Sequence, residues 1–131
     1  MSAVSLTIRA LLAQSGVTGT TSTRIYPLPV PPTTTLPAIA VALSAEDEEM
    51  LLSGASQYAL SAVQIHCIAA TAKAAIDLGE AVKTALRDRL YTADSPPSVY
   101  ASFQKDGPDF TDYSDNMTTH RRVMVFTVRW R

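Results

Sequence analysis

The clearest hydrophobic pattern in the chain is an alternation over residues 58–71. Val63 and Ile65 fall on one side of this run, and the more polar Gln64 and His66 fall on the other. Successive side chains of a strand point to opposite faces of a sheet, so this pattern predicts a strand with one buried face.

After Thr71 the pattern changes to that of an amphipathic helix. Apolar residues recur three and four positions apart, as at Leu78, Val82 and Leu86. Thr71 stands where the period changes, and its hydroxyl can accept a hydrogen bond from an otherwise unpaired amide of the first turn. A strand is therefore expected to lead directly into a long helix, with Cys67 and the other apolar strand residues packed beneath that helix.

Four further segments complete the predicted order of elements. Apolar residues at helical spacing predict a short helix over 2–14, which ends before Gly16. Short apolar or alternating runs predict strands over 38–44, 98–104 and 120–131. The order is therefore helix, strand, strand, long helix, strand, strand.

This order predicts an α+β fold, with a mainly antiparallel sheet of about four strands and two helices packed on one face. The two long apolar strands, 58–71 and 120–131, are expected to pair near the centre of the sheet. The other face of the sheet is then open and too apolar to remain in water, so another subunit is expected to cover it. Its side chains are expected to be either Leu60, Met124, Phe126, Val128 and Trp130 or the set opposite to them.

The chain of 131 residues is expected to form one domain, 1–131, with three irregular segments. Five of the eight prolines lie within 27–37, which predicts an extended, polyproline-like segment. This segment is either a stiff surface connection or an arm that contacts a neighbouring subunit. Acidic loops are predicted at 45–54 and 105–118, the first of them within a hairpin.

Composition excludes several classes of function. The net charge of -1 provides no excess of basic residues for binding a nucleic-acid backbone. A single cysteine, Cys67, cannot form an internal disulfide and is expected to be a buried core residue. The start of the chain does not resemble a signal peptide, and no apolar stretch reaches the ~20 residues that a membrane helix needs. We expect a soluble protein that is made in the cytoplasm.

The sequence lacks the usual patterns of catalytic and metal sites. His66 and His120 have no cysteine or carboxylate beside them at the spacing of zinc ligands. The glycines form no phosphate-binding loop, and no serine lies in a Gly-x-Ser-x-Gly motif. Four aspartates recur every three residues, at Asp106, Asp109, Asp112 and Asp115. They do not have the spacing of a calcium loop, so we predict no enzyme activity, no metal and no cofactor.

Four short stretches, in this order along nearly the whole chain, carry a resemblance to a known family. They are the N-terminal helix with Gly16-Val17 and 23–27 (TRIYP), then Leu36-Pro37, then 63–71 (VQIHCIAAT) with 79–82 (GEAV) and Ala85-Leu86, and finally 125–131 (VFTVRWR). With them, the chain resembles the tail-completion family of long-tailed phages, whose members are tail terminators or tail-to-head joining proteins.

The resemblance implies a subunit of a ring, typically a hexamer, on the head-proximal end of the tail tube. Such a ring stops polymerisation of the tube and presents a surface for the head connector. The implied partners are further copies of the chain, the tube protein and the connector or neck protein. The implied location is the virion tail, after assembly in the bacterial cytoplasm, and DNA passes through the lumen without specific binding.

Two sets of residues are predicted to meet these partners or the lumen. Acidic residues that would repel DNA phosphate, or face a partner, are Glu46, Asp47, Glu48, Glu49, Asp106, Asp109, Asp112 and Asp115. A subunit interface is predicted on the mixed face of the 58–71 strand, at Leu60, Gln64, His66 and Ile68.

Other classes of protein remain open. The chain could be another neck component, such as an adaptor or a stopper, or a tube subunit. It could also be an oligomeric binding module outside phages, which neighbouring genes unrelated to tails would favour. A small enzyme is the third and weakest possibility. A stable monomer with a closed pocket would contradict the ring.

Overall fold

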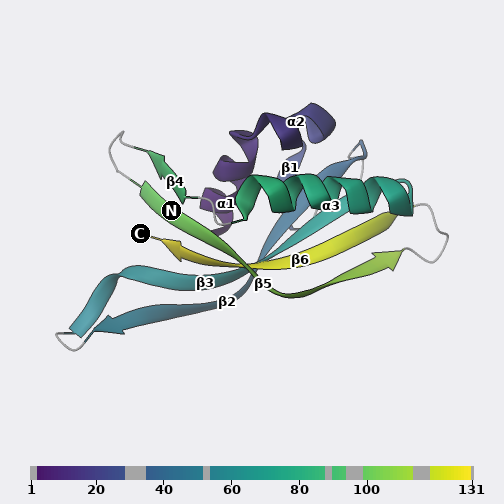
Figure 1. Ribbon diagram of the computed structural model, residues 1–131. Helices are drawn as coiled ribbons and strands as arrows, with labels where there is room; N and C mark the ends of the chain where they lie inside the picture. The colour runs from purple at the N-terminus through teal and green to yellow at the C-terminus, as the bar shows by residue number, and fades with distance from the viewer. Residues whose placement is uncertain are drawn as a thin grey trace.

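The computed structural model describes residues 3–28, 35–51, 54–87, 90–93, 99–113 and 119–130. The elements in chain order are α1 (Ala3–Leu12), α2 (Ser15–Thr21), β1 (Ile25–Pro27), β2 (Ala38–Leu51), β3 (Gly54–Ala69), α3 (Ala72–Leu86), β4 (Leu90–Ala93), β5 (Val99–Tyr113) and β6 (His120–Trp130). Within these residues, six strands form one sheet in the order β1-β2-β3-β6-β5-β4 (Figure 1).

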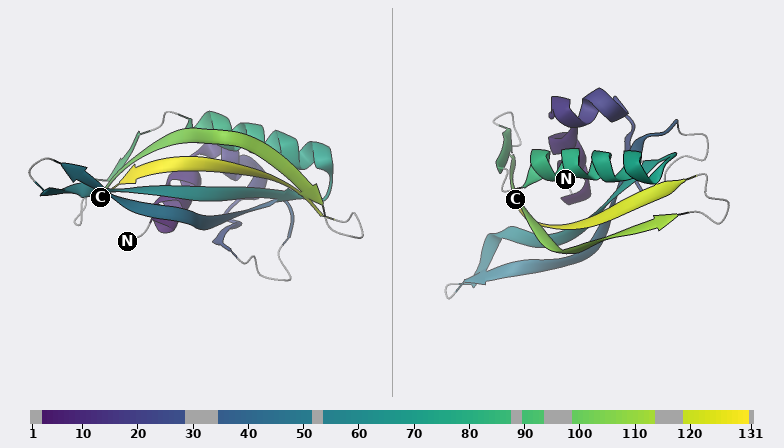
Figure 2. Two further views of the ribbon diagram at one scale, coloured as in Figure 1. Left: turned by 90° about the horizontal axis from the view of Figure 1, so that it is seen from below. Right: turned by 45° about the vertical axis from the view of Figure 1, so that its right-hand side comes forward.

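The helices pack on one face of the sheet and leave the other face uncovered by helices. Seen from below, the strands lie in front and the helices behind them (Figure 2, left). Helix α3 contacts β6 and β3, and α1 and α2 pack beside it. The α+β class is confirmed. The sheet is mixed because β1 runs parallel to β2, and with six strands it is larger than predicted.

The third helix, α2, has no counterpart in the predicted order of elements, which ends the first helix before Gly16. The first turn of α2 begins at the carbonyl of Gln14, which accepts hydrogen bonds from Val17 N and Thr18 N. The hydroxyls of Thr18 and Thr21 donate to carbonyls four residues earlier, so these side chains find their partners within the helix. Val17 is wholly buried, and its burial stabilises α2 against the low helix propensity of its glycines.

The sheet ends in two short strands that the sequence did not predict. Strand β1 lies where the proline-rich segment begins, and its edge position suits proline, which lacks an amide donor. Strand β4 occupies the opposite edge and follows the long helix, where no strand is predicted. Residues 29–34, the middle of the predicted polyproline-like segment, lie outside the described residues.

The two predicted acidic loops are largely strands, which corrects the prediction. Strand β2 continues to Leu51 and β5 continues to Tyr113, and residues 52–53 and 114–118 lie outside the described part of the chain. A register shift between Asp106 and Phe110 accommodates Gly107 and Pro108, two residues that favour turns. Charged residues are compatible with strands whose side chains reach water.

The predicted hairpin between β2 and β3 is confirmed, and it forms a long ribbon. The last pair between β3 and β6 is Ala59 with Trp130, whereas β2 and β3 remain paired as far as Leu51 and Gly54. The ribbon therefore projects beyond the rest of the sheet (Figure 1, lower left).

The centre of the sheet is the predicted pairing of β3 with β6. Val63 lies opposite Phe126 and Ile65 opposite Met124, and these four side chains point toward the helices. Met124, Phe126 and Val128 therefore belong to the core, which excludes the first of the two alternative sets for the open face and favours the opposite residues of β6. The alternation of the strand was clear, but the choice of face needed the register with β3.

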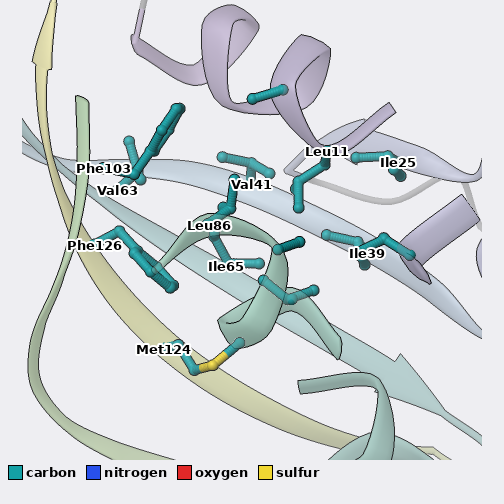
Figure 3. Close-up of a cluster of buried hydrophobic side chains, with 14 of the residues drawn as sticks. Leu11, Ile25, Ile39, Val41, Val63, Ile65, Leu86, Phe103, Met124 and Phe126 are labelled. Carbon is teal, nitrogen blue, oxygen red and sulfur yellow. The ribbon is translucent and has the colours of Figure 1, made fainter. Parts of the chain in front are cut away.

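One apolar cluster fills the space between the sheet and the helices (Figure 3). Its wholly buried members include Val63, Ile65 and Cys67 of β3 and Val82 and Leu86 of α3, as predicted. Each large side chain buried here contributes about 1.5–3 kcal/mol.

The predicted N-cap of α3 is confirmed. The hydroxyl of Thr71 accepts a hydrogen bond of 3.1 Å from Ala74 N, and the backbone of Thr71 is extended. The cap fixes the point where β3 turns into the helix that covers it.

Candidate functional site

The outward face of the sheet, opposite the helices, carries the predicted interface residues. Strand register places each of them beside a residue of β6 that shares this face. The pairs are Leu60 with Arg129, Gln64 with Val125, His66 with Val123, and Ile68 with Arg121. Strand β5 adds Phe110 beside Val123 and Asp112 beside Arg121.

The apolar side chains of the outward face differ in exposure. Phe110 is 54% exposed and Leu60 is 36% exposed, and they lie on different strands. Ile68 and Val123 are buried on this face, although no helix covers them. Of the predicted interface residues, Leu60 therefore offers apolar surface to a partner, while Ile68 contributes mainly to the packing of the subunit itself.

A polar row crosses the outward face from β3 to β6. Arg121 Nη1 lies 3.1 Å from His66 Nδ1, and His66 Nε2 lies 3.3 Å from Gln64 Oε1. A guanidinium has donors but no acceptor, so Nδ1 must accept and the proton of the neutral imidazole is assigned to Nε2. Burial, and secondarily the charge of Arg121, lowers the pKa of His66 below its ordinary value of 6.5.

The predicted acidic residues do not form one surface. Asp109 points toward Arg122 and its side chain is 19% exposed, and its role in the lumen or at a partner surface stays a prediction. Asp112 is exposed on β5. The backbone of the run from Glu46 to Glu49 lies in β2, from the body of the sheet into the ribbon, but the side chains of this run and of Asp106 are outside the described structure. Asp115 is outside the described residues altogether.

Asp109 instead belongs to an ion-pair network beneath α3, centred on Arg122 of β6. The guanidinium donates to Asp109 Oδ2 at 2.6 Å and to Glu80 Oε1 at 2.9 Å. It also donates to the carbonyl of Ile76 at 3.0 Å, while Lys105 forms an ion pair with Asp109. The network therefore joins α3, β5 and β6, and we call it the Arg122 network.

Desolvation opposes the charges of this network, but their pairing outweighs it. Burial alone raises the pKa of Asp109, yet hydrogen bonds from Lys105 and Arg122 hold that pKa below its usual range. Burial alone lowers the pKa of Arg122, but Asp109 and Glu80 raise it by more, so this pKa lies above its ordinary value. Asp109 and Arg122 are therefore both charged at neutral pH.

The Arg122 side chain packs against α3 at Gly79, where the helix has no side chain to block it. A Cβ atom on Gly79 would lie 2.5 Å from Cδ of Arg122, which is closer than two such carbons can approach. Sequence reasoning missed this network, although two signals were present. Arg122 shares strand parity with Met124 and Phe126, which predicts an inward cation, and Gly79 interrupts an amphipathic helix.

The described residues contain no group of three or more His, Cys, Asp or Glu side chains placed to hold a metal ion. Burial raises the pKa of Cys67 to about 12, so this thiol stays protonated at neutral pH and is a poor nucleophile. No described helix is both long and apolar enough to cross a membrane.

Comparisons with known proteins bear on the whole chain. A search of curated sequences finds no match. Among solved structures, a chain from the "Virion of native gene transfer agent (GTA) particle" matches with a TM-score of 0.64 and 22% sequence identity. The alignment covers 99% of this chain and 98% of that one, and it shows a shared fold.

The family comparison is more specific than the structural one. The sequence profile described as "Tail completion protein gp17" matches residues 7–131, which include all of the sheet and most of α1. The chain is therefore a structural protein of phage tails, and it belongs to the tail completion protein gp17 family.

Proposed function

We propose that the chain caps the head-proximal end of the tail tube as a ring of identical subunits, six in number as the family resemblance implies. This ring stops polymerisation of the tube and provides the surface for head joining. The observation that carries this proposal is the family match over residues 7–131. The match includes the outward face and the ribbon, the two regions that are not enclosed by the subunit's own core.

The arrangement of surfaces supports a ring. A ring of identical subunits joins two different patches of each subunit head to tail. The outward face of β3 and β6 provides one patch, with the exposed Leu60 at one end and Phe110 on the neighbouring strand. The ribbon provides a second, because it extends away from the body of the subunit (Figure 1).

Deletion of the gene distinguishes the capping role from other neck roles. If the chain stops the tube, tails without it are longer than normal and carry no heads. Headless tails of normal length would instead assign the chain to joining, as an adaptor or stopper does. Electron microscopy of tails from the deletion strain, with the gene restored on a plasmid as the control, measures both properties.

The ring itself is tested with purified protein and purified tails. Ring-shaped particles on tube ends, seen by electron microscopy, are expected when the protein is added to tails from the deletion strain. Rings in the free protein would also support the proposal, whereas a protein that stays monomeric and leaves tube growth unchanged contradicts it.

We further propose that acidic residues of β2 and β5 face the DNA channel and repel phosphate. The run from Glu46 to Glu49 and the exposed Asp112 are the residues concerned. Replacing them with lysine is expected to slow DNA ejection, since the channel would then attract the DNA. The matched control is Asp77→Lys, an exposed position on α3. Unchanged ejection in the β2 and β5 variants would remove these residues from the channel.

A further inference from the structure

We propose that His66 and Arg121 form a proton-operated switch on the outward face of the sheet. With a neutral imidazole, His66 holds the Arg121 guanidinium against the sheet. With a protonated imidazole, the contact is lost and the guanidinium turns away from His66.

The contact requires the neutral form because of the donors on each side. Arg121 Nη1 approaches His66 Nδ1 to 3.1 Å, and a guanidinium can only donate. Protonation places an N–H on Nδ1, so two donors and two positive charges would face each other at this distance. The other ring nitrogen keeps its role in both forms, because Nε2–H donates to Gln64 Oε1 in each.

The neighbouring strands do not place a carboxylate directly beside His66 to stabilise its charged form. On β2 the residue opposite is Ala40, flanked on the same face by Ala38 and Ala42. On β6 the residue opposite is Val123. On β3 itself the same-face neighbours are Gln64 and Ile68.

The charged groups that share this face lie one strand or one pair further away. Arg121 is the cation of the switch, and Asp112 of β5 is its register partner. The backbone of Asp106 pairs with Val125, two residues along β6 from Val123. Asp112 thus lies beside Arg121, and among the described side chains the charge in contact with the imidazole is the positive one of Arg121.

The titration of His66 has a definite sign. Burial and Arg121 both lower its pKa in the folded protein, so the folded state binds this proton less readily than the unfolded state does. The contribution of the neutral imidazole to stability is complete above its ordinary pKa of 6.5 and is lost as pH falls toward the lower folded value. At acid pH the outward face gains one charge and a released guanidinium, and both disfavour burial of this face by another subunit.

Nuclear magnetic resonance of the imidazole nitrogens tests the switch in the full-length wild-type protein. At neutral pH we expect a protonated Nε2 and an unprotonated Nδ1 for His66, assigned with the variant His66→Asn. As pH falls, the Arg121 side-chain signal should shift with the same midpoint as the His66 ring. The proposal is overturned if Nδ1 carries a proton at neutral pH. It is also overturned if the Arg121 side-chain signal does not shift at the midpoint of the His66 titration.

Two variants separate this contact from general electrostatics. Arg121→Met removes the donor and the charge, and the His66 midpoint should rise without reaching that of an unfolded peptide, because burial remains. Arg129→Met removes a second arginine of the outward face, eight positions along β6, and should leave the midpoint unchanged. If Arg121→Met disturbs the amide spectrum, Arg121→Lys provides a shorter cation for the same comparison. Equal shifts in the Arg121 and Arg129 variants contradict the switch.

These measurements do not depend on the ring. They use the subunit alone, so a failure of the proposed capping role leaves their outcome interpretable. A failure of the switch likewise leaves the capping role untouched.

Discussion

The two faces of the central strands carry alternate residues of the same segments, yet they are built differently. Along β6, the inward Met124, Phe126 and Val128 are wholly buried beneath the helices. The outward Val125, Thr127 and Arg129 remain half-buried on a face without helices. A residue's parity along the strand therefore decides whether it serves the folding of the subunit or is available to a neighbour.

The two faces also differ in the burial and the partners of their arginine side chains. The inward face buries Arg122 to 8% exposure and surrounds it with Asp109 and Glu80. The outward face leaves Arg121, the adjacent residue, against a neutral histidine. A buried charge needs ionic partners, whereas a half-buried one is also solvated by water.

The largest expected effect on stability comes from comparing a phenylalanine on the inward face with one on the outward face. Phe126→Ala removes a wholly buried ring and is expected to lower the free energy of unfolding by about 3–5 kcal/mol. Phe110→Ala, on the outward face, is expected to change it by about 0.5 kcal/mol or less. Urea unfolding of both variants measures the difference, and equal losses would mean that the subunit alone already buries the outward face.

A smaller effect is expected from the glycine that lies against the Arg122 network. Gly79→Ala places a methyl group against Arg122 Cδ, and the hydrogen bonds of the guanidinium prevent that side chain from moving freely. A loss of about 1–3 kcal/mol is expected. The control is Gly19→Ala in α2, where nothing lies within 4 Å of the added atom and a gain of about 0.4–1 kcal/mol is expected. A gain in both variants would contradict the tight packing at Gly79.

The Arg122 network also predicts a dependence on acid. Its pairing holds the pKa of Asp109 below the ordinary 3.8, so stability from this group is present above that value and is lost as pH falls through the lower folded pKa. Asp109→Asn should be less stable than the wild type at neutral pH, with a smaller further loss on acidification. Thermal unfolding between neutral pH and pH 2 tests this, and parallel curves for the two proteins would exclude Asp109 as a source of the acid dependence.

The smallest effect on the stability of the subunit is expected at Leu60, where a substitution should have a large effect on ring assembly. Leu60→Glu changes a side chain that is 36% exposed, so the free energy of unfolding should stay within about 0.5 kcal/mol of the wild type. Ring formation should nevertheless fail, because a charge would be buried at the proposed interface. Leu12→Glu, at an exposed position on α1, is the control and should still form rings. Normal rings from Leu60→Glu would show that the interface lies elsewhere.

Much of the fold could be predicted from alternation and from one cap. The parity of Val63 and Ile65 identified the inward side of β3, and Thr71 marked the start of α3, because both signals depend on neighbours in the sequence. The same parity placed Leu60, Gln64 and His66 together on the mixed face. The contact of His66 with Arg121 could not be predicted, since the two residues are 55 positions apart in sequence and the contact depends on the register between their strands.

The remaining errors have one physical origin. Asp109 was expected in a solvated loop because Gly107 and Pro108 favour turns, but a shift in register lets β5 continue and turns Asp109 toward Arg122. In α2 the burial of Val17 outweighs the low helix propensity of Gly16. In both places a tertiary contact overrides a local preference, and local patterns contain no record of that contact.

The position of Trp130 gives the protein a built-in optical reporter. It is the sole tryptophan of the chain, at the end of β6 where the ribbon leaves the sheet, and its Nε1–H donates to Ser61 Oγ at 2.9 Å. Its ring packs partly against the apolar cluster, so its fluorescence spectrum depends on both the core and the base of the ribbon. Emission from this one indole can therefore follow unfolding in solution, and it can follow attachment to a tail end without any added dye.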